Sequence, residues 1–230
     1  GIGNVEVQPR KVMVFYDSNE SPDLLRSDVT RYLAMPLQYL GLVPEYHDLQ
    51  QPAPDLTLAG RYAGIVVWSK SGNALRLGDW LQRQIQQGMK VALVGDLVAG
   101  DNPASLQAWG LQAGGPVTRN GRIDIQRQNP ALGLEAPALP QASVLQPVRL
   151  RTGNGNDAWL TLQQNGRPIA DPVAITSWGG YALPPFILIE LPNATQRWVL
   201  DPFRFLQAAL RLPPLPAPDV TTEDGRRVLI

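Results

Sequence analysis

The stretch KVMVFYD, residues 11–17, decides how the rest of this 230-residue sequence is interpreted. It is rich in β-branched and aromatic residues and lacks polar–apolar alternation, which is typical of a strand buried on both faces. The runs AGIVVW at 63–68 and KVALVGD at 90–96 share this character, and a shorter strand is predicted over 44–49. Amphipathic helices are predicted between them, with Asp28, Asp79 and Asn102 as capping residues. Because strands that alternate with helices form parallel sheets, the pattern predicts an α/β fold: a Rossmann-like or flavodoxin-like, mostly parallel sheet flanked by helices.

The sequence changes character after residue 113. Residues 114–172 are rich in Gly, Pro, Asn and Gln and predict short strands over 143–151 and 158–164, with a hairpin turn at Asn165-Gly166. We interpret this stretch as a β-rich insertion in an α/β domain of residues 1–212, with a second domain as the alternative. Apolar strands over 185–191 and 197–200 and a helix that begins after Asp201 complete the predicted domain.

The end of the chain predicts a domain boundary. Residues 213–219 are Pro-rich and predict a semi-rigid linker. Residues 220–230 end in the apolar run VLI and predict the truncated start of a following domain. The chain is therefore expected to be a segment of a longer protein.

Composition excludes several kinds of site. Twenty Lys and Arg balance twenty Asp and Glu, so the chain lacks the positive field of a nucleic-acid-binding protein. There is no Cys, and His47 is the one His, which excludes thiolate nucleophiles, zinc–thiolate sites and sites with several His ligands. No apolar run approaches the roughly 20 residues that span a bilayer, so membrane insertion is not expected. A Ser-His-Asp triad would need His47 as its base, and no companion motif supports that role.

Candidate ligand-binding residues follow from the predicted sheet. Ligands of open parallel sheets bind beyond the carboxyl ends of the strands, which selects the polar residues of three loops: Asp17, Ser18, Ser69, Ser71, Gly72 and Asp96. The loop Ser69-Lys70-Ser71-Gly72 offers hydroxyls, an ammonium group and a flexible backbone that could hold an anion. Asp17 and Asp96 could bind a cation or act as acid and base, or could simply cap turns. The glycine-rich nucleotide-binding patterns are absent from these loops, so no cofactor, metal or catalytic residue is predicted.

A second candidate surface is aromatic. Trp178 and Tyr181 flank two glycines, and such rings can stack on sugars where a ligand approaches closely. The alternative is burial, because aromatic side chains contribute large areas to protein cores. Glycan stacking predicts that both rings are exposed on one face.

The runs at 11–17, 28–42, 61–68 and 88–96 resemble the Rossmann-like region of the PelA family, bacterial periplasmic proteins of Pel exopolysaccharide biosynthesis. The tail DVTTEDGRRVLI, residues 219–230, resembles the segment that leads into that family's polysaccharide-deacetylase domain. The resemblance implies a periplasmic parent with a glycoside-hydrolase domain before this segment and a deacetylase after it. The parent would cleave and deacetylate a polymer rich in N-acetylgalactosamine. None of the family's catalytic residues falls within this chain.

Two functions remain open at this point. The first is a non-catalytic scaffold whose partners are the flanking hydrolase and deacetylase domains, an export-machinery protein or the polysaccharide. The second is a small-molecule or glycan-binding α/β domain that uses the strand-end loops. A cavity closed by the protein's own side chains favours the first, and an open polar pocket favours the second.

Overall fold

A computed structural model describes residues 8–72, 74–97, 103–134 and 145–213, together with the backbone of 220–221 and 227–228. Eight strands form one sheet in the order β2-β1-β3-β4-β10-β9-β8-β6. The bounds of these strands are β1 Lys11–Tyr16, β2 Val43–Asp48, β3 Gly64–Ser69, β4 Val91–Gly95, β6 Asp124–Gln128, β8 Asp157–Gln164, β9 Arg167–Thr176 and β10 Gly179–Ala182. The pairs β5 (Leu111–Ala113) with β7 (Val148–Leu150), β11 (Leu188–Glu190) with β12 (Gln196–Trp198), and β13 (Val220–Thr221) with β14 (Arg227–Val228) form small separate sheets.

The helices are short. They are η1 Leu24–Arg26, η2 Val29–Leu33, α1 Ala34–Tyr39, α2 Gly78–Gln86, α3 Pro103–Ala108, η3 Pro130–Leu132 and α4 Pro202–Ala209. The predicted helix after residue 28 is split into a π-helical turn, η2, and α1. Pro36 lies in the first turn of α1, where it contributes no N–H to the helical hydrogen bonds.

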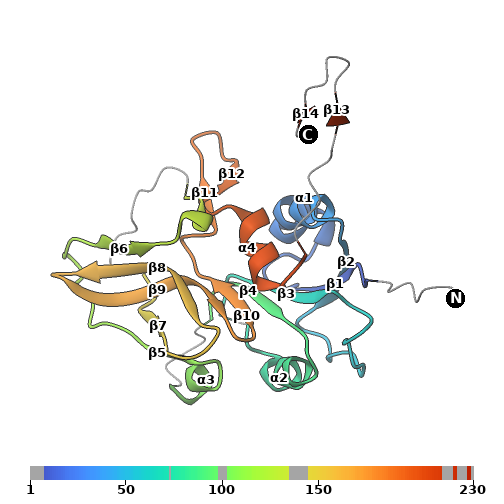
Figure 1. Cartoon of the computed structure of the whole chain (residues 1–230), viewed down its shortest axis with the longest axis horizontal. Coiled ribbons are helices and arrows are strands. Elements are labelled where there is room, and N and C mark those ends of the chain that lie inside the picture. Colours follow the sequence, from blue (N-terminus) through green and yellow to red (C-terminus); the bar gives the residue numbers. More distant parts are fainter. Residues whose placement is uncertain are drawn as a thin grey trace, which may run out of the picture.

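The predicted Rossmann-like or flavodoxin-like fold is wrong, because the sheet is mixed and the chain is mostly β, with 21% of its residues helical. β2, β1, β3, β4 and β10 run parallel, whereas β10–β9, β9–β8 and β8–β6 pair antiparallel. Figure 1 shows the long β8–β9 hairpin extending away from the parallel strands. The β-rich stretch therefore adds three strands to the main sheet itself, so an alternation of single strands and helices describes just the first half.

Several local predictions are confirmed. β1 is buried along most of its length, with Val12 and Val14 on one face and Met13 and Phe15 on the other. Asn165 has a φ of 51° and Gly166 of 75°, as the predicted hairpin turn between β8 and β9 requires. The Asp201 carboxylate accepts hydrogen bonds from two N–H groups in the first turn of α4, so it caps this helix.

Of the predicted linker at 213–219, only residue 213 is among the described residues. Of the predicted segment 220–230, the backbone of β13 and β14 is described. The capping residue proposed at Asn102 also lies outside the described residues. Asp79 lies inside α2, which has no side-chain cap, and Asp28 makes no cap hydrogen bond to η2.

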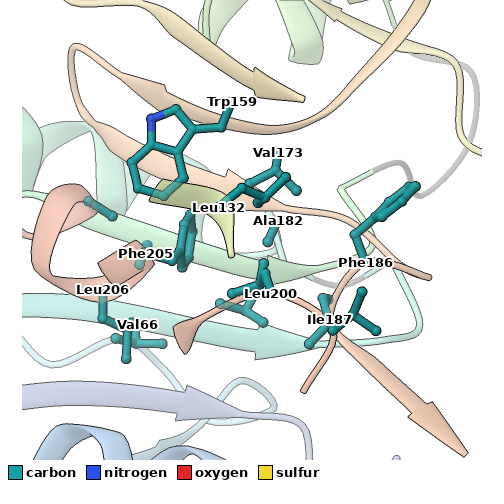
Figure 2. Packing of buried hydrophobic residues seen from close by; sticks show 14 of the residues in the cluster. Val66, Leu132, Trp159, Val173, Ala182, Phe186, Ile187, Leu200, Phe205 and Leu206 are labelled. Atoms are coloured by element: carbon teal, nitrogen blue, oxygen red, sulfur yellow. The ribbon is translucent and has the colours of Figure 1, made fainter. Parts of the chain in front are cut away.

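Hydrophobic clusters cover both faces of the sheet. On one face, η2, α1 and α4 pack over β1, β3 and β10, and Figure 2 shows Phe205 and Leu206 of α4 reaching toward Val66 and Ala182. Trp159 of β8 meets Phe205 edge to face at 6.4 Å between ring centroids, which joins the antiparallel part of the sheet to α4. On the other face, α2 and residues around α3 cover β1, β3 and β4.

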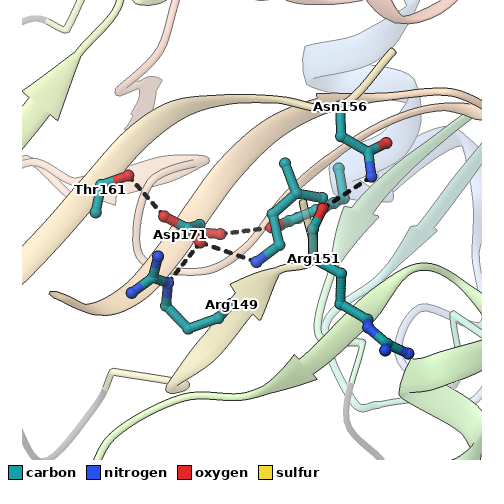
Figure 3. Close-up of polar contacts among 7 residues, drawn as sticks. Arg149, Arg151, Asn156, Thr161 and Asp171 are labelled. Carbon is teal, nitrogen blue, oxygen red and sulfur yellow. Dashed lines mark hydrogen bonds and ion pairs between the residues drawn. The ribbon is translucent and has the colours of Figure 1, made fainter. Parts of the chain in front are cut away.

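A buried polar cluster joins β7, β8 and β9 (Figure 3). The Asp171 carboxylate accepts hydrogen bonds from Arg149 Nε at 2.8 Å, the Leu150 N–H at 2.8 Å and Thr161 Oγ1 at 2.6 Å. Asp171 is 1% exposed. Because the three donors come from two strands, the cluster fixes β7 against the β8–β9 hairpin.

Candidate functional site

A polar cavity of about 260 Å³ lies where the predicted ligand-binding loops meet, beyond the carboxyl ends of β1 and β3. β2 lies on one side of β1 and β3 lies on the other, so the order in which strands are added to the sheet switches from one side of β1 to the other at this point. Ligands of open parallel sheets bind in such a crevice. The residues that line the cavity are Tyr16, Asp17, Glu20, Ser21, Arg26, Ser27, Asp28, Val29, Trp68, Lys70 and Ser71.

The carboxylate of Glu20 occupies the donors of the loop after β3. Its Oε1 accepts hydrogen bonds from the N–H of Lys70 and the N–H of Ser71, each at 2.6 Å, and from Ser69 Oγ at 3.3 Å. Two successive backbone N–H groups aimed at one point form a concave anion-binding site. The anion that this loop holds in the structure is thus a carboxylate of the protein itself.

Asp17 organises the neighbouring loop. It directly follows β1, is 2% exposed, and accepts hydrogen bonds from Gln50 Nε2 at 2.9 Å and from the Asn19 N–H at 3.0 Å. Its other oxygen lies 3.5 Å from Ser71 Oγ, so the loops after β1 and β3 meet here. The structure therefore brings Asp17 and Ser71 together, as the strand-end argument predicts.

Ser18 connects this loop to the end of β2. Its N–H donates to Asp48 Oδ1 at 3.2 Å, and the Gln50 N–H donates to the same oxygen at 3.0 Å. Burial works against the charge on Asp48, but these hydrogen bonds outweigh it and hold the pKa of the carboxyl below its usual value. Burial, helped by the nearby Asp48 charge, raises the pKa of Tyr16.

An ion pair closes one side of the cavity. Lys70 Nζ lies 2.5 Å from Asp28 Oδ2, and both side chains are partly exposed. Arg26 also lines the cavity, and its guanidinium lies 3.5 Å from the carboxylate of Asp23. Three carboxylates and two cations thus line the cavity: Lys70 pairs with Asp28, and Arg26 pairs with Asp23, which lies outside the lining.

Of the six candidate residues, Asp17 and Ser71 line the cavity, and Ser18, Ser69, Gly72 and Asp96 do not. Gly72 adopts a φ of +80°, which favours glycine, and it turns the chain after β3. The Asp96 N–H donates to the Ser69 carbonyl at 2.8 Å, so its backbone joins the ends of β3 and β4. Their roles in ligand binding stay predictions.

Trp178 and Tyr181 are buried, as the alternative interpretation expects, so they do not form the exposed face that glycan stacking requires. Trp178 is 7% exposed, donates from Nε1 to the Trp109 carbonyl at 2.9 Å and meets the Trp109 ring edge to face. Tyr181 is fully buried and donates its hydroxyl to the Asp171 carbonyl at 2.7 Å. Glycine is required at position 179 by packing and not by the approach of a ligand, because a Cβ there would overlap the backbone of Val91 in the adjacent strand.

His47 lies on the edge strand β2, which β1 separates from β3 in the sheet. Its Nε2 lies 2.9 Å from Glu45 Oε1, which also accepts the Tyr62 hydroxyl at 2.8 Å. The bond with His47 lowers the pKa of Glu45. His47 therefore belongs to a polar cluster with Glu45 and Tyr62 at the edge of the sheet.

Sequence reasoning missed Glu20 and Asp28 as members of the site. Glu20 lies in the turn after β1, where an acidic residue is ordinary. Its partners are 49 to 51 positions further along the chain, so no local signal identifies it. Asp28 was expected to cap a helix, and it pairs instead with Lys70.

Among the described residues, no group of three or more His, Asp or Glu side chains could hold a metal ion. Within the same ranges, no helix is long and apolar enough to cross a membrane. No known protein-family model matches this chain. No curated protein matches it either. The function is therefore inferred from the site.

Proposed function

We propose that this chain is a non-catalytic interaction module of a multidomain exopolysaccharide-modifying protein. One observation carries the proposal: the polar groups at the carboxyl ends of β1 and β3 are bonded to one another. Glu20 fills the backbone donors of Lys70 and Ser71. A site in which the protein's own side chains satisfy the donors is arranged for holding loops together.

The contacts of Ser69 and Ser71 support a site without a serine nucleophile. A serine nucleophile is activated by an adjacent base that a third group orients. Ser69 Oγ faces Glu20 and Ser71 Oγ faces Asp17, at 3.3 and 3.5 Å. The one histidine of the sequence is paired with Glu45 on β2. Ser71 lines the cavity and Ser69 ends β3, whereas the imidazole lies on β2.

The resemblance to the PelA family supplies the context of the proposal. In such a parent the module would lie in the periplasm between a glycoside hydrolase and a deacetylase. It would orient these two domains, or bind an export-machinery protein or the polymer. A non-catalytic module in this position increases the rate of polymer modification by keeping the two enzymes near the same chain.

A second candidate function rests on the cavity itself. Its volume of about 260 Å³ is below the range of about 300–1,000 Å³ that encloses drug-sized ligands. It contains the nearly buried carboxylate of Asp17 beside the aromatic residues Tyr16 and Trp68. This combination suits the end group of a small molecule or glycan, bound by the strand-end loops.

The test is an NMR titration of the ¹⁵N-labelled chain with N-acetylgalactosamine oligosaccharides, fully acetylated and partly deacetylated, and with nucleotides as controls. The interaction-module proposal predicts no saturable shifts with nucleotides and no cleavage or deacetylation of the oligosaccharides. Saturable nucleotide shifts at the cavity, or turnover of any oligosaccharide, would contradict it. Glycan shifts confined to residues that line the cavity would favour the second candidate.

A matched experiment on the parent protein tests the scaffold role directly. Residues 8–213 are replaced by a flexible linker, and activity is measured on short oligosaccharides and on long polymer. We expect the short substrates to be processed as before and polymer modification to fall. Equal activity on both substrates would show that the module contributes nothing to coupling.

A further inference from the structure

The Glu20 carboxylate occupies a binding site that it does not itself build. All three of its donors belong to residues 69–71, at the end of β3, whereas Glu20 belongs to the loop after β1. Glu20 is exposed, and its own backbone is held by a turn in which its N–H donates to the Asp17 carbonyl at 3.1 Å. The carboxylate of one loop is thus held by donors that all belong to another loop.

The donor geometry defines the chemistry of the ligand. Hydrogen bonds from N–H groups to a charged oxygen are short and stronger than neutral ones, and both backbone bonds to Glu20 Oε1 are 2.6 Å long. Such donors recognise an oxyanion in general. The adjoining cavity of about 260 Å³ has room for the rest of a small anionic group.

The charges around the site favour a carboxylate over a phosphate as the ligand. Asp17 and Asp28 also line the cavity. Of the two cations in the lining, Lys70 is paired with Asp28 and Arg26 with Asp23. A dianionic phosphate would meet these two carboxylates with little free positive charge to offset the repulsion. A monoanion with the planar shape of the glutamate side chain reproduces the observed contacts.

We propose that residues Ser69, Lys70 and Ser71 form a carboxylate-binding site that Glu20 occupies in this structure, and that an external carboxylate binds there by displacing Glu20. The ligand's carboxylate takes the two backbone N–H groups and the Ser69 hydroxyl, and the loop after β1 is released from the loop after β3. This inference goes beyond the proposed function and does not depend on it.

The apparent affinity of such a site depends on the internal competitor. When a protein's binding-competent state is a small fraction of the population, the apparent Kd rises by the inverse of that fraction. Glu20 keeps the site filled, so wild-type chain is expected to bind a free carboxylate weakly. Removing the Glu20 carboxylate removes the internal competitor for the same donors.

The experiment uses Glu20→Ala and sodium acetate as the probe, with sodium chloride at equal ionic strength as the salt control. The amide signals of Lys70 and Ser71 are followed by NMR, and the melting temperature is measured alongside. We expect E20A to bind acetate at least tenfold more tightly than the wild-type chain, with saturable shifts at these two amides. Acetate, but not chloride, is expected to raise the melting temperature of E20A.

Two further variants keep the test decisive. Glu190→Ala removes an exposed glutamate of β11, and it should bind acetate no better than the wild-type chain. Glu20→Gln keeps an amide oxygen for the donors and preserves the fold if E20A does not; it should bind acetate with intermediate affinity. Equal acetate affinity in wild type, E20A and E20Q would overturn the proposal. Tighter binding of inorganic phosphate than of acetate would overturn the assignment to carboxylates.

Discussion

Replacing Asp171 by Asn is expected to destabilise the fold by about 3 kcal/mol. The carboxylate is 1% exposed and accepts hydrogen bonds from Arg149, the Leu150 N–H and Thr161. Hydrogen bonds to a charged group contribute about 1.5–3 kcal/mol each, against about 0.5–1.5 for neutral ones. The Asn side chain matches the shape and keeps acceptor capacity, so the loss is roughly 1 kcal/mol for each of three bonds.

Two neighbouring changes show whether charge is the cause. Asp171→Ala also leaves the Leu150 N–H and the Thr161 hydroxyl without an acceptor, and should cost about 4–5 kcal/mol. Arg149→Met should cost less than D171N, because the carboxylate keeps its other two donors. Arg149 is 27% exposed on its side chain, so in D171N its guanidinium can still contact water, which keeps the loss near the lower end of the range for buried pairs.

The measurement is urea and thermal unfolding followed by tryptophan fluorescence and circular dichroism. For a chain of this size each kcal/mol lowers the melting temperature by about 2–4 °C, so D171N should melt about 6–12 °C below wild type. Met35→Gln, at an exposed position of α1, serves as the control and should stay within about 0.5 kcal/mol of wild type. A D171N loss below about 1 kcal/mol, or additive losses in the D171N/R149M double variant, would refute the reasoning.

Two other predictions follow from backbone space and from ionisation. Gly95→Ala should prevent stable folding, because Gly95 has a φ of +134° and a Cβ there would overlap the carbonyl group of Ser69. Gly78→Ala, at the start of α2, should be neutral or slightly stabilising, because a Cβ there meets nothing within 4 Å. Soluble yield and unfolding curves of the two variants distinguish these outcomes. Burial, helped by the nearby Asp171 charge, raises the pKa of Tyr181 far above its usual value, so its stabilising contribution is complete below about pH 10 and is lost as the pH rises beyond it. Stability measured between pH 8 and 11 should therefore fall less steeply in Tyr181→Phe than in wild type, and an unchanged slope would count against a buried neutral Tyr181.

Local chemistry made part of this fold predictable. The burial of Lys11–Tyr16, the turn at Asn165-Gly166 and the cap at Asp201 depend on residues within a few positions of each other. Such signals are contained in a short window of sequence. The direction in which a strand pairs is not: β10 lies parallel to β4 and antiparallel to β9, and both partners are chosen by tertiary packing.

The wrong fold class has a specific origin in β8 and β9. The Gly, Pro, Asn and Gln content of residues 114–172 indicated an insertion rather than strands of the main sheet, and Thr161 and Asp171 add polar side chains to this stretch. In the structure these two side chains bond each other at 2.6 Å inside the sheet. Because burial of polar groups depends on partners far along the chain, the composition of this stretch gave no indication of it.

The candidate site shows the same division. Asp17 and Ser71 were predicted because strand ends of a parallel sheet share one edge, and this holds for the parallel part of the mixed sheet. Trp178 had two interpretations because a Trp beside glycines has the same local pattern whether it stacks on a ligand or fills a core. The deciding fact is the contact with Trp109, which lies 69 positions away.

Glu20 connects the proposed lack of catalysis with the proposed exchange of ligands. Backbone N–H groups aimed at an open point stabilise a negative charge that develops during a reaction. The N–H groups of Lys70 and Ser71 instead donate to the Glu20 carboxylate, so they stabilise a charge that is already present in the resting protein. Chemistry that used these donors would first need Glu20 to leave. The same departure is what an external carboxylate would bring about, so at this site the chain can bind an anion without gaining a nucleophile to act on it.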